Sequence, residues 1–320
     1  MTRKKKPKPL WRKIVGGVFY AAFCACALAV GTGYRYISDY PAFFNIIVHQ
    51  IRPAAPEETF NKDSLTLLLL GVDEDRSPRT KQILKEQARS DMMLVARLDF
   101  KANQVTGVSI PRDTLLALPG YRTQKINAYH AIGGRELAER AVEFLLGVGI
   151  DRTVVIDYKA LQDMVDLVGG VEINVEKRLK YHDNWGDLHV DLKPGLQTLN
   201  GYQAMGYVRI RKSDDDFHRQ ERQKQFLLAF KEAMQKNVLV SPQVIQKAAD
   251  SLGGALTDEE IGTLSHFARK VGGDNIRLGV IPTEPAGDFN LRVRERDLYK
   301  TLIEYHLIGN PSSGSRVSYR

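Results

Sequence analysis

The hydrophobic pattern between residues 65 and 113 predicts three consecutive strands. The run "LTLLLLGVD" (Leu65–Asp73) is continuously apolar and reaches a Gly turn, as in a strand that is buried on both faces. The segments "DMMLVARLD" (Asp91–Asp99) and "QVTGVSIPRD" (Gln104–Asp113) follow, separated by the tight turn "KANQ" and stopped at Pro111. We therefore expect a meander in which the first strand runs up, the second down and the third up again.

Helical and strand patterns alternate through the rest of the chain. Gly134–Gly149 has helical spacing and a Gly stop, and Asn200 with Gln203 predicts a capping box at the start of a short helix. Further strands are expected at Asp151–Asp157, Val171–Val175, Tyr207–Arg211 and Asn275–Glu284, and further helices at Tyr158–Gly170 and Arg219–Lys236. This mixture predicts an α/β fold, namely a single layered domain with a central mixed β-sheet flanked by helices.

The N-terminal part has a different composition and predicts a membrane anchor. A basic tail precedes an apolar segment whose first charge is Arg35, and this length suits one transmembrane helix with a cytoplasmic N-terminus. The alternative is a cleaved signal peptide, because "ACA" at Ala25–Ala27 resembles a cleavage site. The expected organisation is a basic tail (1–13), a transmembrane helix (14–36), a Pro-containing stalk (37–62), a folded domain outside the membrane (63–309) and a disordered tail (310–320).

The net charge and the cysteines exclude two classes of function. The formal charge of +8 falls to +1 when the seven Lys/Arg of residues 1–13 are left out, so the folded part is nearly neutral. Wholesale nucleic-acid binding therefore loses its main support. Both cysteines, Cys24 and Cys26, lie in the apolar segment, so the domain has neither a disulfide nor a reactive thiolate.

Charged residues flank the expected strands at one end. If the three strands form an up-down-up meander, five charged residues gather at one edge of the sheet: Asp73, Arg89, Asp91, Arg112 and Asp113. For any one of them the simpler explanation is that strand ends meet water. Two carboxylates, Asp73 and Asp91, beside clustered Arg would suit Mg²⁺, which one or two carboxylates hold together with substrate phosphates.

A second group of cations lies between residues 207 and 230. In the expected strand Tyr207–Arg211, Arg209 and Arg211 share one face and would clamp a phosphate bidentately. In the following helix, one stripe begins polar and becomes aromatic, which suits a ligand with an anionic head and an apolar tail. The alternative is a solvated helix start paired with nearby Asp residues. The stripe consists of Arg219, Arg222, Gln223, Phe226 and Phe230.

Several common site motifs are missing from the sequence. His182 and His189 in "YHDNWGDLH" are the nearest approach to a metal-binding pair, and surface-loop histidines explain them better than zinc. No Gly-rich phosphate loop and no GxSxG motif occurs. The cation groups are therefore the main candidate site.

Seven ordered blocks between Leu65 and Phe230 resemble the LytR-CpsA-Psr family of bacterial cell-wall glycopolymer transferases. The blocks are "LLLLGVD", "ARSDMMLV", "VSIPRDT", "KINAYHAIGG", "VVIDYKALQDMVDLVGGVEI", "LKPGLQTLNGYQAMGYVRIRK" and "HRQERQKQF". The resemblance implies a membrane-anchored phosphotransferase that moves a glycopolymer, such as teichoic acid or capsule, from a polyprenyl-pyrophosphate carrier to peptidoglycan.

The resemblance also assigns roles to residues. It implies Mg²⁺ on Asp73 and Asp91, a lipid pocket at Phe226 and Phe230, and catalytic roles for Asp91, Arg112 and Arg89. The residues implied to bind pyrophosphate are Arg89, Arg112, Lys125, Arg209, Arg211, Arg219 and Gln223.

Two alternative functions fit the same residues. A pyrophosphatase acting on the same lipid differs only in that water replaces the sugar hydroxyl as nucleophile. A non-catalytic, lipid-binding regulator of the cell envelope would also use an anion site.

Overall fold

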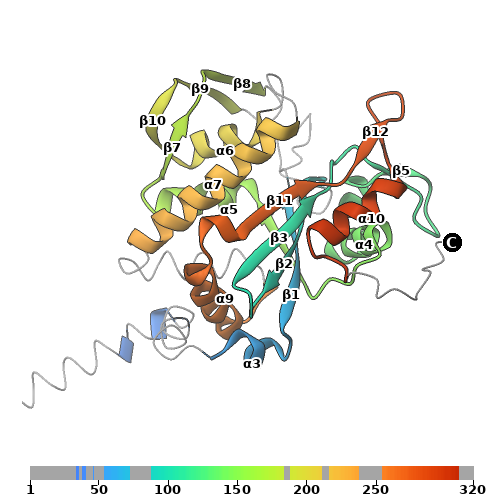
Figure 1. Ribbon diagram of the computed structural model, residues 1–320. Coiled ribbons are helices and arrows are strands. Elements are labelled where there is room, and N and C mark those ends of the chain that lie inside the picture. The colour runs from blue at the N-terminus through green and yellow to red at the C-terminus, as the bar shows by residue number, and fades with distance from the viewer. Residues whose placement is uncertain are drawn as a thin grey trace, which may run out of the picture.

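The computed structural model describes residues 34–35, 38–40, 46, 54–72, 88–183, 188–210, 216–237 and 254–309 (Figure 1). The expected membrane-spanning segment 14–36 lies almost wholly outside these residues, as does the expected tail 310–320. No helix within the described ranges has both the length and the apolar character that crossing a membrane requires. The membrane anchor therefore stays a prediction.

A five-stranded mixed sheet forms the centre of the fold, in the order β11-β3-β2-β1-β6. β1 pairs antiparallel with β2, and β2 pairs antiparallel with β3, so the expected meander is confirmed. β6 runs parallel to β1, and β11 runs parallel to β3. The strands are β1 (Ser64–Val72), β2 (Ser90–Asp99), β3 (Gln104–Ser109), β6 (Arg152–Asp157) and β11 (Ile276–Val280).

One side of the sheet is covered by helices α4 (Ala128–Leu146) and α10 (Glu295–Glu304), as Figure 1 shows. This main core joins side chains that alternate along the strands, including Leu68, Leu70, Met93, Val95 and Val108, to apolar residues of α4. α4 begins six residues earlier than expected and bends where Gly134 adopts a left-handed backbone (φ 63°).

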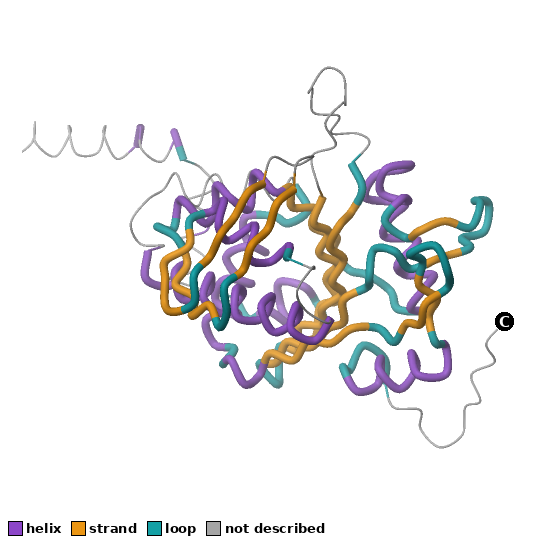
Figure 2. Tube along the Cα trace, turned by 90° about the horizontal axis from the view of Figure 1, so that it is seen from above, coloured by secondary structure: helices purple, strands orange, loops and turns teal. Residues whose placement is uncertain are grey.

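A second core lies on the other side of the sheet, away from α4 and α10. It is built by helices α5 (Tyr158–Leu167), α6 (Gly201–Arg209) and α7 (Asp216–Asn237) and by strands β7 (Val171–Val175), β8 (Leu179–Asp183), β9 (Leu188–Leu192) and β10 (Gly195–Leu199). β7 pairs with β10 and β8 with β9, each antiparallel. Figure 2 shows these strands set apart from the central sheet.

The expected strand Tyr207–Arg211 is wrong, because α6 continues through Arg209. The helix starts at the predicted capping box of Asn200 and Gln203, in which each side chain accepts a hydrogen bond from the backbone N–H of the other residue. Gly201 packs so tightly on α5 that a Cβ atom there would lie 2.2 Å from the carbonyl oxygen of Gln162. The docked helix start therefore overrides the local β-branched pattern.

Short elements complete the domain. Helix α3 (Pro56–Phe60) falls within the expected stalk and packs on α9 (Asp258–Lys270). Its Phe60 ring stacks on Phe100, which directly follows β2, at 5.6 Å.

Two small antiparallel strand pairs lie outside the central sheet. One pair, β4 with β5, follows β3, and the other, the hairpin of β12 and β13, precedes α10. These elements are β4 (Leu115–Leu116), β5 (Gln124–Lys125), the 3₁₀ turn η2 (Gly273–Asn275), β12 (Thr283–Pro285) and β13 (Leu291–Val293).

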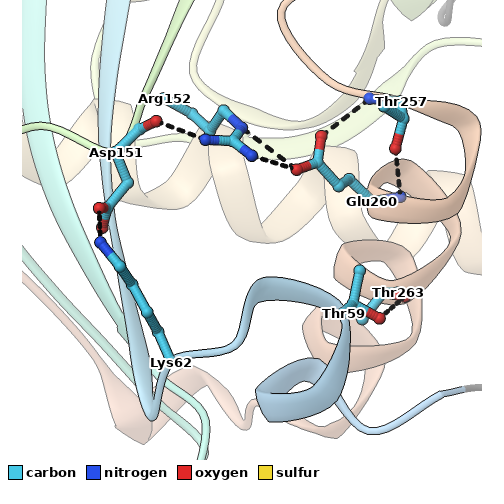
Figure 3. Close-up of polar contacts among 7 residues, drawn as sticks. All are labelled: Thr59, Lys62, Asp151, Arg152, Thr257, Glu260 and Thr263. Carbon is cyan, nitrogen blue, oxygen red and sulfur yellow. Dashed lines mark hydrogen bonds and ion pairs between the residues drawn. The ribbon is translucent and has the colours of Figure 1, made fainter.

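Polar contacts fasten α9 to the end of the sheet at which β6 begins (Figure 3). Glu260 accepts hydrogen bonds from the Arg152 guanidinium at 2.5 and 3.2 Å. Its other oxygen accepts from the Thr257 backbone N–H at 2.9 Å, which completes the capping box of α9. The Thr59 and Thr263 hydroxyls lie 3.1 Å apart and join α3 to the same helix.

We expect Glu260→Ala to lower the free energy of unfolding by about 2–3 kcal/mol, because the helix cap and a charged hydrogen bond are lost together. Glu260→Gln keeps the acceptor for the cap and is expected to cost less. Urea denaturation measures both, with the exposed neighbour Glu259→Ala as a matched control that should stay within about 0.5 kcal/mol. Equal losses for Glu259→Ala and Glu260→Ala would contradict this assignment.

Candidate functional site

Four charged side chains form a connected chain at one edge of the central sheet. Arg112 Nη1 donates to Asp91 Oδ1 at 2.6 Å, and Arg112 Nε lies 3.7 Å from Asp113 Oδ2. Lys125 Nζ donates to Asp113 Oδ1 at 2.8 Å. All four side chains are only partly exposed, so the cluster lines a sheltered surface rather than projecting into water.

The strand directions bring these residues together as the sequence predicts. Asp91 lies at the start of β2, and Arg112 and Asp113 follow the end of β3, which is the same edge because the two strands are antiparallel. Val72, the last residue of β1, pairs with Ser90. Asp73 itself lies outside the described residues, but the described end of β1 is next to the strand start that carries Asp91.

The segment Ile126–His130 holds the strand ends in place. The Asn127 N–H donates to the Arg112 carbonyl, and the Asn127 carbonyl accepts from the Ser90 N–H, each at 3.4 Å. His130 Nδ1 donates to the Ala88 carbonyl at 2.9 Å. These bonds attach Ala88 and Ser90, which flank Arg89, and the backbone of Arg112 to one short segment. The "KINAYH" block therefore acts as a clip between β2 and the end of β3.

The Arg112 guanidinium is held firmly in its charged form. Burial lowers the pKa of Arg112, but the charge and hydrogen bond of Asp91, with the nearby Asp113, outweigh burial and raise the pKa above its usual value. Tyr158 also contributes, so the first residue of α5 is within electrostatic reach of Arg112. Tyr158 packs against the second core, which places the charged edge next to that core.

The three stripe residues of α7 whose side chains are described, Arg222, Phe226 and Phe230, face inward, as their spacing predicts. Arg222 is only 8% exposed, Phe226 is buried, and the Phe226 and Phe230 rings stack at 5.9 Å within the second core. Arg222 Nη2 donates to the Ile210 carbonyl at 2.8 Å, so it ties α7 to the chain just past α6. The alternative of a solvated helix start is wrong for Arg222.

The structure describes the side chain of only one of the remaining predicted phosphate ligands, Arg89. Arg89 is exposed directly before β2, on the edge that carries Asp91. The proposed strand clamp of Arg209 and Arg211 is wrong, because Arg209 ends a helix. Arg211 lies outside the described residues, and only the backbone is described for Arg209, Arg219 and Gln223.

Sequence reasoning assigned no role to His130 and Phe289, which the structure brings to this region. It placed Arg222 on the helix stripe but assigned it no role of its own. For Arg222, the signal was its i, i+4 spacing to Phe226, which predicts a buried position. Phe289 lies in a hairpin whose contact with Lys125 is long-range and leaves no local signal.

His182 and His189 lie opposite each other in β8 and β9 rather than in a surface loop. The expectation of loop histidines is therefore wrong for their backbone. Within the described ranges, no group of three or more His, Cys, Asp or Glu side chains is arranged to hold a metal ion.

A sheltered row of alternating charges at the ends of two strands, next to an apolar core, is the candidate site of this α/β protein. The sequence model of the LytR_cpsA_psr family matches residues 47–301. Because this match covers well over half of the chain, the chain belongs to the LytR_cpsA_psr family.

Named relatives include transferases and a regulator. The chain is 28% identical to "Polyisoprenyl-teichoic acid--peptidoglycan teichoic acid transferase TagT" of Bacillus subtilis (strain 168), covering 94% of this chain and 96% of that protein. It is 36% identical to the transferase TagU of Enterococcus faecalis (strain ATCC 700802 / V583), covering 52% of each chain. It is 33% identical to "Regulatory protein MsrR" of Staphylococcus aureus (strain COL), covering 54% of this chain and 50% of that protein. The last two matches thus span about half the length of those relatives.

Solved structures share the fold. TagV of B. subtilis superposes with a TM-score of 0.60 at 26% identity, covering 76% of this chain and 97% of that chain. TagT bound to LI-WTA has a TM-score of 0.58 at 26% identity, covering 77% and 91%. YwtF (TagT) with bound octaprenyl pyrophosphate lipid has a TM-score of 0.55 at 25% identity, covering 77% and 90%.

We expect Arg222→Met to lower the free energy of unfolding by about 1–3 kcal/mol, because the Ile210 carbonyl loses a charged donor in a buried place. Met retains most of the side-chain volume, so packing changes little. Urea denaturation measures the loss, and Arg140→Met, an exposed Arg on α4, serves as the control. If both variants unfold at the same urea concentration, Arg222 does not anchor α7.

Proposed function

We propose that this protein is a phosphotransferase that moves a glycopolymer from a polyprenyl-pyrophosphate carrier to peptidoglycan. The observation that carries the proposal is the Asp91–Arg112–Asp113–Lys125 cluster at a sheltered strand edge beside an apolar core. Relatives named as teichoic acid transferases and a related structure with bound octaprenyl pyrophosphate support the same substrate class.

The cluster suits a diphosphate because it can exchange partners. Arg112 is bonded to Asp91 and is near Asp113, and Lys125 is bonded to Asp113. A guanidinium fork and an ammonium group both match phosphate oxygens, and Arg does so bidentately. The apolar stripe of Phe226 and Phe230 on α7 would border the polyprenyl chain, while Arg89, Arg209, Arg211, Arg219 and Gln223 would add further polar contacts.

The reaction needs positioning and charge stabilisation more than covalent chemistry. The acceptor hydroxyl oxygen attacks the phosphorus on the glycopolymer side and forms a new P–O bond. The bond from that phosphorus to the bridging oxygen breaks, and polyprenyl phosphate leaves with the bridging oxygen. The hydroxyl proton passes to a nearby base or to solvent. Arg112 would stabilise the charge that develops on the phosphoryl oxygens.

A divalent metal fits the oxygen ligands at this edge. Asp91 uses Oδ1 for Arg112, and a carboxylate offers a second oxygen to a hard cation. Asp91 and Asp73, together with substrate phosphates and water, would hold Mg²⁺, which would neutralise phosphate charge. This ligand set also explains why a cluster of three protein ligands is unnecessary.

The cellular setting follows from the N-terminal segment. We propose a bacterial membrane protein with a single helix at residues 14–36, a cytoplasmic N-terminus and the domain outside the membrane. The carrier lipid and the peptidoglycan acceptor would both be within reach of a domain anchored in this way.

We expect Arg112→Ala to lower turnover at least about 100-fold, because a preorganised charge at the transferring phosphoryl group is lost. Arg112→Lys keeps the charge but not the planar fork, so it should recover only part of the activity. Glycopolymer transfer by the full-length protein in detergent measures this, with Arg140→Ala as the control. Normal transfer by Arg112→Ala would contradict the proposed site.

The products of the same assay separate transfer from hydrolysis. A transferase attaches the phosphorylated glycan to peptidoglycan, whereas a pyrophosphatase releases it free in solution. Release that is unaffected by added peptidoglycan would replace the transferase with the hydrolase.

We expect removal of divalent cations with EDTA to abolish transfer and added Mg²⁺ to restore it. Asp91→Asn keeps a hydrogen-bond acceptor for Arg112 but removes the charge, so the Mg²⁺ concentration for half-maximal activity should rise about tenfold or more. Metal titration of turnover measures this. Full activity in EDTA would exclude the metal from the mechanism.

A further inference from the structure

The tip of the β12–β13 hairpin exposes one aromatic ring. Phe289 is 95% exposed, the highest value among the large apolar side chains that the structure describes. Its backbone is left-handed (φ 58°), as are those of the two preceding residues, Gly287 (φ 80°) and Asp288 (φ 44°). A bulky residue other than Gly rarely adopts this conformation.

The hairpin is fixed to the charged edge rather than projecting freely. The Leu291 N–H donates to the Asp113 carbonyl at 3.0 Å, and Leu291 bridges to Thr114. The Phe289 carbonyl accepts from Lys125 Nζ at 3.3 Å, and the same ammonium group bonds the Asp113 carboxylate. The hairpin therefore places the backbone of Phe289 next to Lys125, one of the proposed phosphate ligands.

The ring contributes little to the fold at this position. A side chain that is almost fully exposed buries hardly any apolar surface, and a left-handed backbone disfavours any side chain with a Cβ atom. Strained residues that stay at a functional edge are often used in binding. The ring therefore has no packing role in the folded chain, which leaves its face available to a ligand.

We propose that the Phe289 ring is a stacking platform for a pyranose ring of one of the two saccharides that meet at the phosphate bound by Lys125 and Arg112. This inference rests on the proposed function and deepens it. The face of an aromatic ring is electron-rich, so it attracts the slightly positive C–H groups on one face of a sugar. The sugar hydroxyls stay at the water-exposed rim, while the phosphate reaches the cations.

A membrane surface is a poorer partner for this tip. Asp288, which precedes Phe289 in the chain, is exposed and would be repelled by anionic lipid headgroups. A single ring next to one acidic residue also lacks the apolar face of a membrane-binding element. A saccharide needs only one ring and tolerates carboxylates, which accept hydrogen bonds from its hydroxyls.

Two sugars could occupy the platform, and binding assays separate them. The first is the sugar next to the pyrophosphate of the lipid-linked donor, and the second is a sugar of the peptidoglycan acceptor. The probes are octaprenyl pyrophosphate, the same lipid carrying N-acetylglucosamine, and a soluble oligosaccharide of N-acetylglucosamine and N-acetylmuramic acid. All are titrated onto the full-length protein in detergent.

Phe289→Gly removes the ring and suits the left-handed backbone, so the melting temperature should stay the same or rise. We expect this variant to bind unsubstituted octaprenyl pyrophosphate like wild type. It should bind one of the two saccharide probes about 5- to 10-fold more weakly. Phe289→Trp should retain that affinity. The control is Phe144→Ala, at an exposed Phe near the C-terminal end of α4, and it should bind every probe like wild type.

Each outcome decides a separate point. Weaker binding of the saccharide-bearing lipid alone assigns the platform to the donor, and weaker binding of the soluble oligosaccharide alone assigns it to the acceptor. Wild-type affinity of Phe289→Gly for both saccharides overturns the platform, as does a loss confined to the unsubstituted lipid. Failure of the wild-type protein to bind octaprenyl pyrophosphate would instead contradict the proposed function.

Discussion

The clip made by Ile126–His130 is the constraint on which the charged edge depends. Two strands that run in opposite directions meet at this edge, and their ends would diverge without a connection. Backbone groups of Asn127 and the His130 ring bond to Ala88, Ser90 and Arg112, so the two strand ends are fixed relative to each other. Buried backbone groups need partners, and these bonds supply them at the point where Asp91 and Arg112 must meet.

The charges at this edge are balanced within the protein. Two carboxylates and two cations alternate, so each of these four charges has an opposite charge beside it. Under the proposed function, a diphosphate competes with Asp91 and Asp113 for Arg112 and Lys125, and a cation on Asp91 would favour that exchange. Since the pKa of Arg112 is raised, the guanidinium stays positive throughout the physiological pH range.

Two cores meet at the charged edge and serve different purposes. The core under α4 and α10 fixes the sheet, while the second core holds the aromatic end of α7. Tyr158 lies between them, because it packs against the second core and is near Arg112. Arg222 fastens α7 to the carbonyl of Ile210, the residue that follows α6, from a buried position.

The sequence by itself determined the meander of β1, β2 and β3, the capping box at Asn200 and the meeting of Asp91 with Arg112. These follow from short-range patterns and from the geometry of antiparallel strands, which need no distant partner. Only the tertiary structure decided that Arg209 ends a helix and that Phe289 lies beside Lys125. Each depends on contacts between segments far apart in the chain, and such contacts leave no periodic signal in the local sequence.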